Sequence, residues 1–193
     1  MLPEFEPPEV VSAAAAAGFG LVGICLEPAR FAARFAELCD HAAPAGITVV
    51  VEPTILYSVT TLAEAKQVVA LAGRPNGAIL ADNLHLDRAG GEPIAALGQL
   101  DPALLPYAQL CDAPARPAEV SRSGLFDDAR DGRRLLGDGG LPVREYLDAL
   151  PAGIPLSLEI RSRRLRERCP DATERATRVH ANATHYLAGS VAE

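Results

Sequence analysis

Residues 47–52 read Ile-Thr-Val-Val-Val-Glu, a run of β-branched residues that ends in a carboxylate. Such a run is typical of a strand that is buried on both faces of a parallel sheet. Three later segments follow the same plan, each an apolar stretch that ends in an acid: 78–82, 107–112 and 155–159. Because helical patterns separate these stretches, the sequence predicts successive parallel strand–helix units.

The predicted strands end in the acids Glu52, Asp82, Asp112 and Glu159. Functional residues of parallel α/β sheets and barrels lie at the carboxyl ends of the strands, so we expect these ends to converge on one metal site. On the third strand, Gln109 is an alternative to Asp112. An acid after a strand is more often only the N-cap of the next helix, which is the better interpretation for any one of them alone. Their recurrence in successive units favours the metal site.

Carboxylate and amide oxygens are the ligands that hard or borderline divalent cations prefer, so Mn²⁺ or Mg²⁺ is the expected cofactor. Such a metal polarises a hydroxy-carbonyl compound and stabilises the enediolate that forms when a proton leaves the neighbouring carbon. Two glutamates, Glu52 and Glu159, would remove and return that proton. His85, three residues after Asp82, would donate a hydrogen bond to a substrate oxygen, although a loop histidine is more often satisfied by its neighbours.

The bulk composition excludes several classes of protein. A length of 193 residues predicts a single domain over residues 1–193 with a sizeable core. The formal net charge of -7 argues against a nucleic-acid surface and is compatible with binding a cation. The acidic, proline-rich start is unlike a signal peptide, and no apolar stretch is long enough to span a bilayer. With four cysteines outside any CxxC or zinc-finger spacing, we expect a cytoplasmic protein that binds no membrane.

Apolar periodicity and capping signals predict the remaining elements. Helices are expected at 10–17, 27–43, 61–73, 92–99, 141–150 and 171–188, and a further strand at 20–25. Thr61 and Glu64 form a predicted capping box. His85 and Arg88 are predicted to lie in a polar loop, and residues 113–140 in one long irregular stretch that is either functional or disordered. The glycine-rich run 137–140 lacks the framing of a phosphate loop and is interpreted as a turn.

These residues resemble the xylose isomerase-like TIM-barrel family of sugar and sugar-phosphate isomerases and epimerases. The resemblance spans most of residues 35–160 in the family's order. It is carried by FAELCDHAAPAGITVVVEP (35–53), PNGAILADNLHLDRAGG (75–91), YAQLCDAP (107–114), RRLLGDGGLPVREYLDALP (133–151) and PLSLEI (155–160). The implied fold class is α/β, a parallel (β/α) barrel of the TIM type.

The resemblance also implies a set of site residues. The family holds its metal by Glu, Asp, His or Gln, and Glu on four late strands, which match Glu52, Asp82, Gln109 and Glu159. Gln109 is therefore preferred to Asp112 as the third ligand. The two glutamates would also be the acid/base pair, as in the family's epimerases. The family's substrate-binding residues match His85, Arg116 and Arg133, with Arg134 as an alternative to the last.

The chain departs from the family in its length. A full barrel takes about 250 residues, so we expect an incomplete barrel of about five to six βα units, without the first strand and one or two that follow the segment around Cys25. Its exposed strand edges would be covered by a second copy of the chain in a homo-oligomer, or by a rearranged element.

The leading hypothesis is therefore a divalent-metal-dependent isomerase or epimerase of a small sugar or hydroxy-carbonyl compound. One alternative is a dehydratase of the same superfamily, and another is a non-catalytic truncated barrel that binds metal or a partner chain. The DNA-repair nucleases of the superfamily need a histidine-rich cluster of zinc ions, which four histidines and a negative net charge do not suit.

Overall fold

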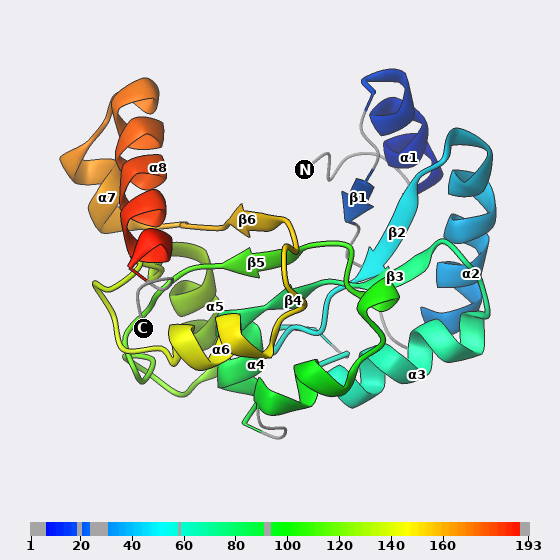
Figure 1. Cartoon of the computed structure of the whole chain (residues 1–193), viewed down its shortest axis with the longest axis horizontal. Helices are drawn as coiled ribbons and strands as arrows, with labels where there is room; N and C mark the ends of the chain where they lie inside the picture. Colours follow the sequence, from blue (N-terminus) through cyan, green and yellow to red (C-terminus); the bar gives the residue numbers. More distant parts are fainter. Residues whose placement is uncertain (1–6, 19–20, 24–30, 58, 91–93, 190–193) are drawn as a thin grey trace. The chain divides into compact units, whose positions relative to one another are not determined.

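The computed structural model describes residues 7–18, 21–23, 31–57, 59–90 and 94–189. Figure 1 labels helices and strands of the chain, which divides into two units. The first unit comprises residues 1–81 and 100–106, and the second comprises residues 82–99 and 107–193. The prediction that residues 1–193 form a single domain stays a prediction.

The first unit contains a parallel sheet in the order β1-β2-β3, formed by β1 (Leu21–Gly23), β2 (Thr48–Val51) and β3 (Gly77–Ile79). The central strand β2 is the β-branched run that the sequence singles out, and its last three residues are buried. The strand expected at 20–25 is confirmed at 21–23, and its other residues lie outside the described part of the chain.

Helices α1 (Pro7–Ala16), α2 (Phe31–Ala42) and α3 (Leu62–Ala72) belong to the first unit, with short 3₁₀ helices η2 (Ala43–Ala45) and η4 (Pro102–Leu104). α2 packs against α1, α3 and the sheet, because Phe35 and Leu38 lie on its buried face. The predicted capping box of α3 is confirmed: Thr61 Oγ1 accepts from the Glu64 N–H at 3.2 Å, and Glu64 Oε2 accepts from the Thr61 N–H at 3.1 Å.

Gly77 lets α2 lie close to β3. A Cβ at Gly77 would lie 2.8 Å from Phe35 Cε1 and 3.3 Å from Cys39 Sγ. We therefore expect Gly77→Ala to lower the free energy of unfolding by about 1–3 kcal/mol through overpacking. At Gly98 the nearest atom to an added Cβ is 3.6 Å away, so Gly98→Ala is the control and should change stability by less than about 0.5 kcal/mol. Urea unfolding measures both, and equal losses would contradict the close approach.

A second sheet has the order β4-β5-β6 and is formed by β4 (Ala81–Asp82), β5 (Ala108–Leu110) and β6 (Leu156–Leu158). All of its residues except Ala81 belong to the second unit. β5 is the central strand, and its pairing with β6 is parallel, with Gln109 opposite Ser157. The single strand expected at 78–82 is divided into β3 and β4, which belong to different sheets. The division falls at Leu80, whose N–H donates to the Val51 carbonyl at 3.0 Å.

The prediction that His85 and Arg88 lie in a polar loop is wrong, because both lie in helix α4 (Asn83–Ala89). The helix begins directly after β4. Asp82 is its N-cap, and Asp82 Oδ1 accepts hydrogen bonds from the N–H groups of Leu84 and His85 at 2.9 and 3.1 Å. The carboxylate that we predict to be a metal ligand thus also accepts the free N–H groups in the first turn of a helix.

The prediction of one irregular stretch over residues 113–140 is also wrong. Helix α5 (Arg122–Asp131) lies within it, and Ser121 caps this helix by accepting a hydrogen bond from the Gly124 N–H at 3.1 Å. The sequence of α5 is mostly polar, with only Asp128 and Ala129 buried. A helix with so narrow a buried face produces little apolar periodicity.

The remaining helices of the second unit are η3 (Ile94–Gln99), α6 (Val143–Ala149), α7 (Arg163–Arg168) and α8 (Ala172–Ala188). The helix expected at 92–99 is a 3₁₀ helix from Ile94, and residues 92–93 lie outside the described part. Asp171 caps α8 as predicted, because it accepts from the Glu174 N–H at 2.8 Å. Among the described residues, no helix is long and apolar enough to cross a membrane. The cytoplasmic location stays a prediction.

Candidate metal centre

The residues predicted to form the site lie on strands or directly after them. Asp82 ends β4, Gln109 lies within β5 and Glu159 directly follows β6. His85 lies in the first turn of α4. These four residues belong to the second unit, and Glu52, half-buried directly after β2, belongs to the first.

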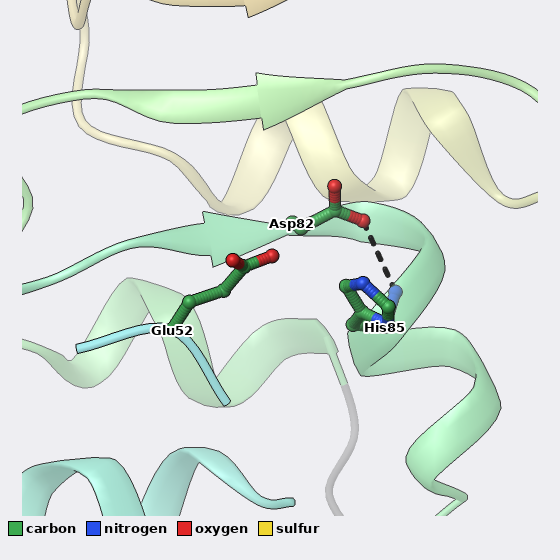
Figure 2. Close-up of side chains that lie close together, drawn as sticks. All are labelled: Glu52, Asp82 and His85. Atoms are coloured by element: carbon green, nitrogen blue, oxygen red, sulfur yellow. Dashed lines mark hydrogen bonds between the residues drawn. The ribbon is translucent and has the colours of Figure 1, made fainter. Parts of the chain in front are cut away.

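Asp82 has both of its carboxylate oxygens engaged. Oδ1 caps α4, and Oδ2 pairs with Arg133 Nη1 at 2.7 Å. Burial alone would raise the pKa of Asp82, but the charge of Arg133, the nearby His85 and the hydrogen bonds from both residues together hold the pKa below its ordinary value. A carboxylate oxygen of Asp82 and a ring nitrogen of His85 lie within 4.8 Å of each other (Figure 2). Burial lowers the pKa of His85, so its imidazole is neutral and suited to binding a metal or a substrate hydroxyl.

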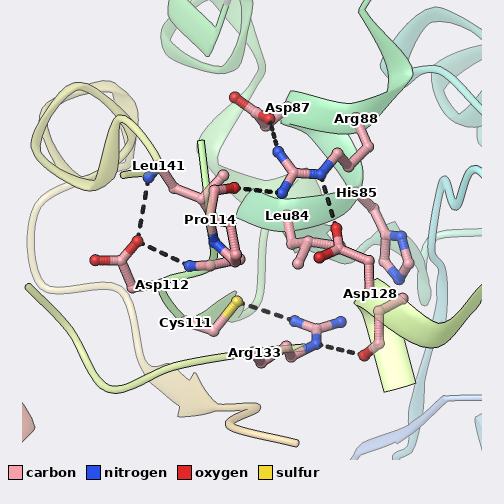
Figure 3. A network of polar contacts seen from close by, with 12 residues as sticks. Leu84, His85, Asp87, Arg88, Cys111, Asp112, Pro114, Asp128, Arg133 and Leu141 are labelled. Carbon is pink, nitrogen blue, oxygen red and sulfur yellow. Dashed lines mark hydrogen bonds and ion pairs between the residues drawn. The ribbon is translucent and has the colours of Figure 1, made fainter. Parts of the chain in front are cut away.

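Arg133 is the centre of the polar contacts in this part of the unit, and only 1% of it is exposed. Nη1 pairs with Asp82 at 2.7 Å, and Nη2 lies 3.1 Å from Glu159 Oε2. Nη1 also lies 3.3 Å from Cys111 Sγ (Figure 3). Nε donates to the Ala129 carbonyl at 2.9 Å. The guanidinium therefore bridges two of the predicted ligands, and its contact with a substrate stays a prediction.

Of the two carboxylates that pair with Arg133, Glu159 is more accessible than Asp82, because 27% of its side chain is exposed. Its position is set by the sheet, since its N–H donates to the Leu110 carbonyl at 3.2 Å. Burial raises the pKa of Glu159 to about 7, opposed by the charge of Arg133 and assisted by the nearby Asp82. A carboxyl group with such a pKa can both release and accept a proton near neutral pH, as acid/base chemistry requires.

Gln109 provides a test of whether these residues fit a metal. Its Oε1 is buried and has no hydrogen-bond partner among the described residues. A buried carbonyl oxygen without a donor is costly, and a cation would satisfy it. Since β5 lies between the strands that lead to Asp82 and Glu159, the donor set is two carboxylates and an amide oxygen, which fits a hard or borderline divalent cation.

Asp112, the alternative ligand on the third strand, uses its carboxylate to accept hydrogen bonds from backbone N–H groups (Figure 3). Its Oδ1 accepts from the N–H groups of Ala113 and Leu141 at 2.8 and 3.1 Å. Its Oδ2 accepts from Gly137 and Gly139 at 3.0 and 2.9 Å. These four donors agree with the choice of Gln109 over Asp112. They also show what the glycine-rich turn does: it surrounds a carboxylate of this chain.

The sequence offers two other arginines as substrate contacts, Arg116 and Arg134. Arg116 is exposed, in the segment between β5 and α5. Arg134 forms an antiparallel bridge with Asp112, and its Nη1 donates to the Asp138 carbonyl at 3.0 Å. Arg134 therefore supports the turn, which favours Arg133 as the arginine of the site.

A cleft of about 450 Å³ opens beside Arg133. It is lined by residues of α5 and α7 and by Ser162, all of which follow the carboxyl ends of β5 and β6 in the chain. The volume lies in the range of small-molecule sites.

Sequence reasoning missed the ion pairs that hold α4. The Arg88 side chain is almost fully buried and pairs with Asp128 at 2.8 Å and Asp87 at 2.5 Å, and it donates to the Pro114 carbonyl at 2.6 Å (Figure 3). Arg88 lies one turn after His85, so these contacts fasten the helix that carries His85 to α5. No sequence signal marks them, because Arg88 and Asp128 are 40 residues apart.

Comparison with known families agrees with this architecture. The family model described as xylose isomerase-like TIM barrel matches residues 26–183. No curated protein matches the chain.

Solved structures of the same fold include an IolI protein with a bound zinc atom, with 17% identity, a TM-score of 0.79, and coverage of 97% of this chain and 69% of that one. An L-ribulose 3-epimerase has 18% identity, a TM-score of 0.66, and coverage of 95% and 66%. The probable 3-DHS dehydratase AsbF of Bacillus anthracis has 18% identity, a TM-score of 0.64, and coverage of 83% and 64%. At these identities the likeness concerns the fold alone.

Proposed function

Because this chain belongs to the xylose isomerase-like TIM-barrel family, we propose that it is a divalent-metal-dependent isomerase or epimerase of a small sugar or hydroxy-carbonyl compound. The observation that carries the proposal is the buried, unpartnered oxygen of Gln109 on the strand between those that end at Asp82 and Glu159. Solved structures that share the fold include two sugar epimerases and a probable dehydratase, which supports an enzymatic role.

In this proposal the metal ligands are Glu52, Asp82, Gln109 and Glu159, with Mn²⁺ or Mg²⁺ as the expected ion. The metal would polarise the substrate carbonyl and stabilise negative charge on its oxygen. His85 would hold a substrate oxygen, and Arg116 and Arg133 are retained as predicted substrate contacts.

The two glutamates would move the proton. One of them removes a proton from the carbon next to the carbonyl group, and the electron pair of the broken C–H bond moves into the enediolate. Return of a proton to the opposite face of the same carbon inverts it, which is epimerisation. Return to the neighbouring carbon moves the carbonyl group, which is isomerisation.

Gln109→Leu tests the metal site through binding alone. The change removes the unpartnered oxygen at similar volume, so we expect the chelator-treated protein to be as stable as wild type or more stable by about 1 kcal/mol. Its affinity for Mn²⁺, measured by titration calorimetry, should fall at least about tenfold because one ligand is lost. Gln99→Leu, an exposed glutamine in η3, is the matched control and should leave the affinity unchanged. Wild-type affinity in Gln109→Leu would remove Gln109 from the site.

The activity itself requires a substrate panel. Protein loaded with Mn²⁺ is incubated with ketoses, hydroxypyruvate and inosose, and the products are identified by NMR in D₂O. An isomerase or epimerase incorporates deuterium at the carbon next to the carbonyl group. No turnover of any panel member by protein with bound metal would contradict this substrate class.

A dehydratase is the second candidate, because AsbF shares the fold and would use the same metal and enolate chemistry. Its products in the panel would have lost water.

A third candidate, a non-catalytic partial barrel, is motivated by coverage of only 64–69% of the three neighbouring chains. Equilibrium sedimentation with the activity assay separates it: a stable monomer with turnover would exclude it, and also the homo-oligomer proposed to cover the strand edges.

A further inference from the structure

We propose that Arg133 is a resident cation of the candidate metal centre: a positioning residue that holds the Asp82 and Glu159 carboxylates and competes with the divalent ion for them. The inference rests on the proposed metal site and deepens it. It assigns to Arg133 a role that acts through the ligands and that limits how tightly the metal binds.

The first support is the use of the guanidinium donors. Nη1 lies 2.7 Å from Asp82 Oδ2, Nη2 lies 3.1 Å from Glu159 Oε2, and Nε donates to the Ala129 carbonyl at 2.9 Å. All three nitrogens therefore have acceptors inside the protein. Arg133 is 1% exposed, so its guanidinium is in place to act on the two carboxylates.

The second support is that Arg133 is held in place by its surroundings. Its backbone N–H donates to the Arg161 carbonyl at 3.1 Å, two residues after Glu159. Ala129, which accepts from Nε, lies on α5, and the buried pair of Arg88 and Asp128 fastens that helix to α4. The guanidinium is thus built into the unit between the two carboxylates.

The third support is electrostatic. A divalent cation bound by Asp82 and Glu159 would use oxygens of the same carboxylates that Arg133 pairs with. Two positive groups a few ångströms apart in a buried site repel each other strongly. Arg133 therefore offsets part of the attraction between the carboxylates and the metal, while holding both carboxylates in place before the metal arrives.

The test compares Arg133→Met, Arg133→Lys and the control Arg134→Met, which alters the neighbouring arginine that supports the turn. Mn²⁺ affinity is measured by calorimetry and thermal unfolding is measured in chelator. Arg133→Met should lower the unfolding midpoint in chelator and tighten Mn²⁺ binding at least about tenfold, because the competing charge is gone. Arg133→Lys should keep an affinity close to wild type, and Arg134→Met should not tighten binding.

Each remaining outcome is decisive. Unchanged or weaker Mn²⁺ binding in Arg133→Met, with wild-type protein that binds, overturns the inference and leaves the proposed function standing. Binding in Arg133→Met but not in wild type supports the inference and removes the proposed function. If Arg133→Met is unfolded in chelator, recovery in excess Mn²⁺ supports the inference, because the metal then replaces the lost cation. Failure to recover overturns it, as does the absence of binding in every variant.

Discussion

Asp112→Ala is expected to destabilise the protein by about 3–5 kcal/mol, near the upper limit for a single substitution. The carboxylate accepts hydrogen bonds from four backbone N–H groups, of which two lie in the glycine-rich turn. Alanine leaves all four donors without their acceptor. It also removes the anchor of the turn that separates Arg133 and Arg134 from α6, so the loss extends beyond the hydrogen bonds themselves.

Asp112→Asn refines this prediction, because asparagine keeps the shape and one acceptor oxygen but turns an N–H₂ group toward two N–H donors. We expect a loss of about 2–3 kcal/mol. Asp138→Asn is the matched control, since Asp138 is exposed in the same turn and carries the same charge; its effect should stay below about 0.5 kcal/mol. Urea unfolding gives all three values. Equal effects of Asp112→Asn and Asp138→Asn would show that net charge, and not the bonded carboxylate, is responsible.

The strands could be predicted because their signal is local. The run at β2 is β-branched and buried, so composition alone identifies it as a strand. The same holds for the caps of α3 and α8, where one side chain binds a backbone N–H three residues later. Such contacts depend on a few neighbouring residues, which a sequence displays directly.

The helices α4 and α5 could not be predicted because their stability comes from distant residues. α4 has seven residues, too short for a clear apolar period, and its buried arginine pairs with an acid on α5. α5 buries only two side chains. In both helices the stabilising contacts join residues about 40 positions apart, and no local pattern shows them.

The candidate site likewise has a part that the sequence shows locally and a part that depends on distant residues. That acids end successive strands is visible in the sequence. The preference for Gln109 over Asp112 came from the family resemblance, and the four N–H partners of Asp112 agree with it. Arg133 was selected only by family resemblance. Its bridging of Asp82 and Glu159 depends on a separation of 51 residues from Asp82, which only the folded chain brings together. Candidate ligands can therefore be predicted from strand ends, whereas a distant cation that pairs with them cannot.

Glu159→Gln is expected to abolish turnover, with a loss of about 10²–10⁴-fold or more, and to weaken Mn²⁺ binding at least about tenfold. Glutamine keeps an oxygen that can accept from Arg133 Nη2, so the fold should be retained. The amide can neither exchange a proton near neutral pH nor offer the metal a negative charge. Turnover of the best panel substrate and calorimetric titration with Mn²⁺ measure the two effects separately.

Glu167→Gln is the matched control, because Glu167 is an exposed glutamate on α7 beside the cleft and the net charge changes equally. Wild-type turnover and affinity are expected there. If Glu159→Gln kept its Mn²⁺ affinity but lost turnover, Glu159 would be a proton-transfer group outside the coordination sphere. If it kept both, the end of β6 would have no part in the chemistry, and the convergence of strand ends on one metal would fail at its fourth member.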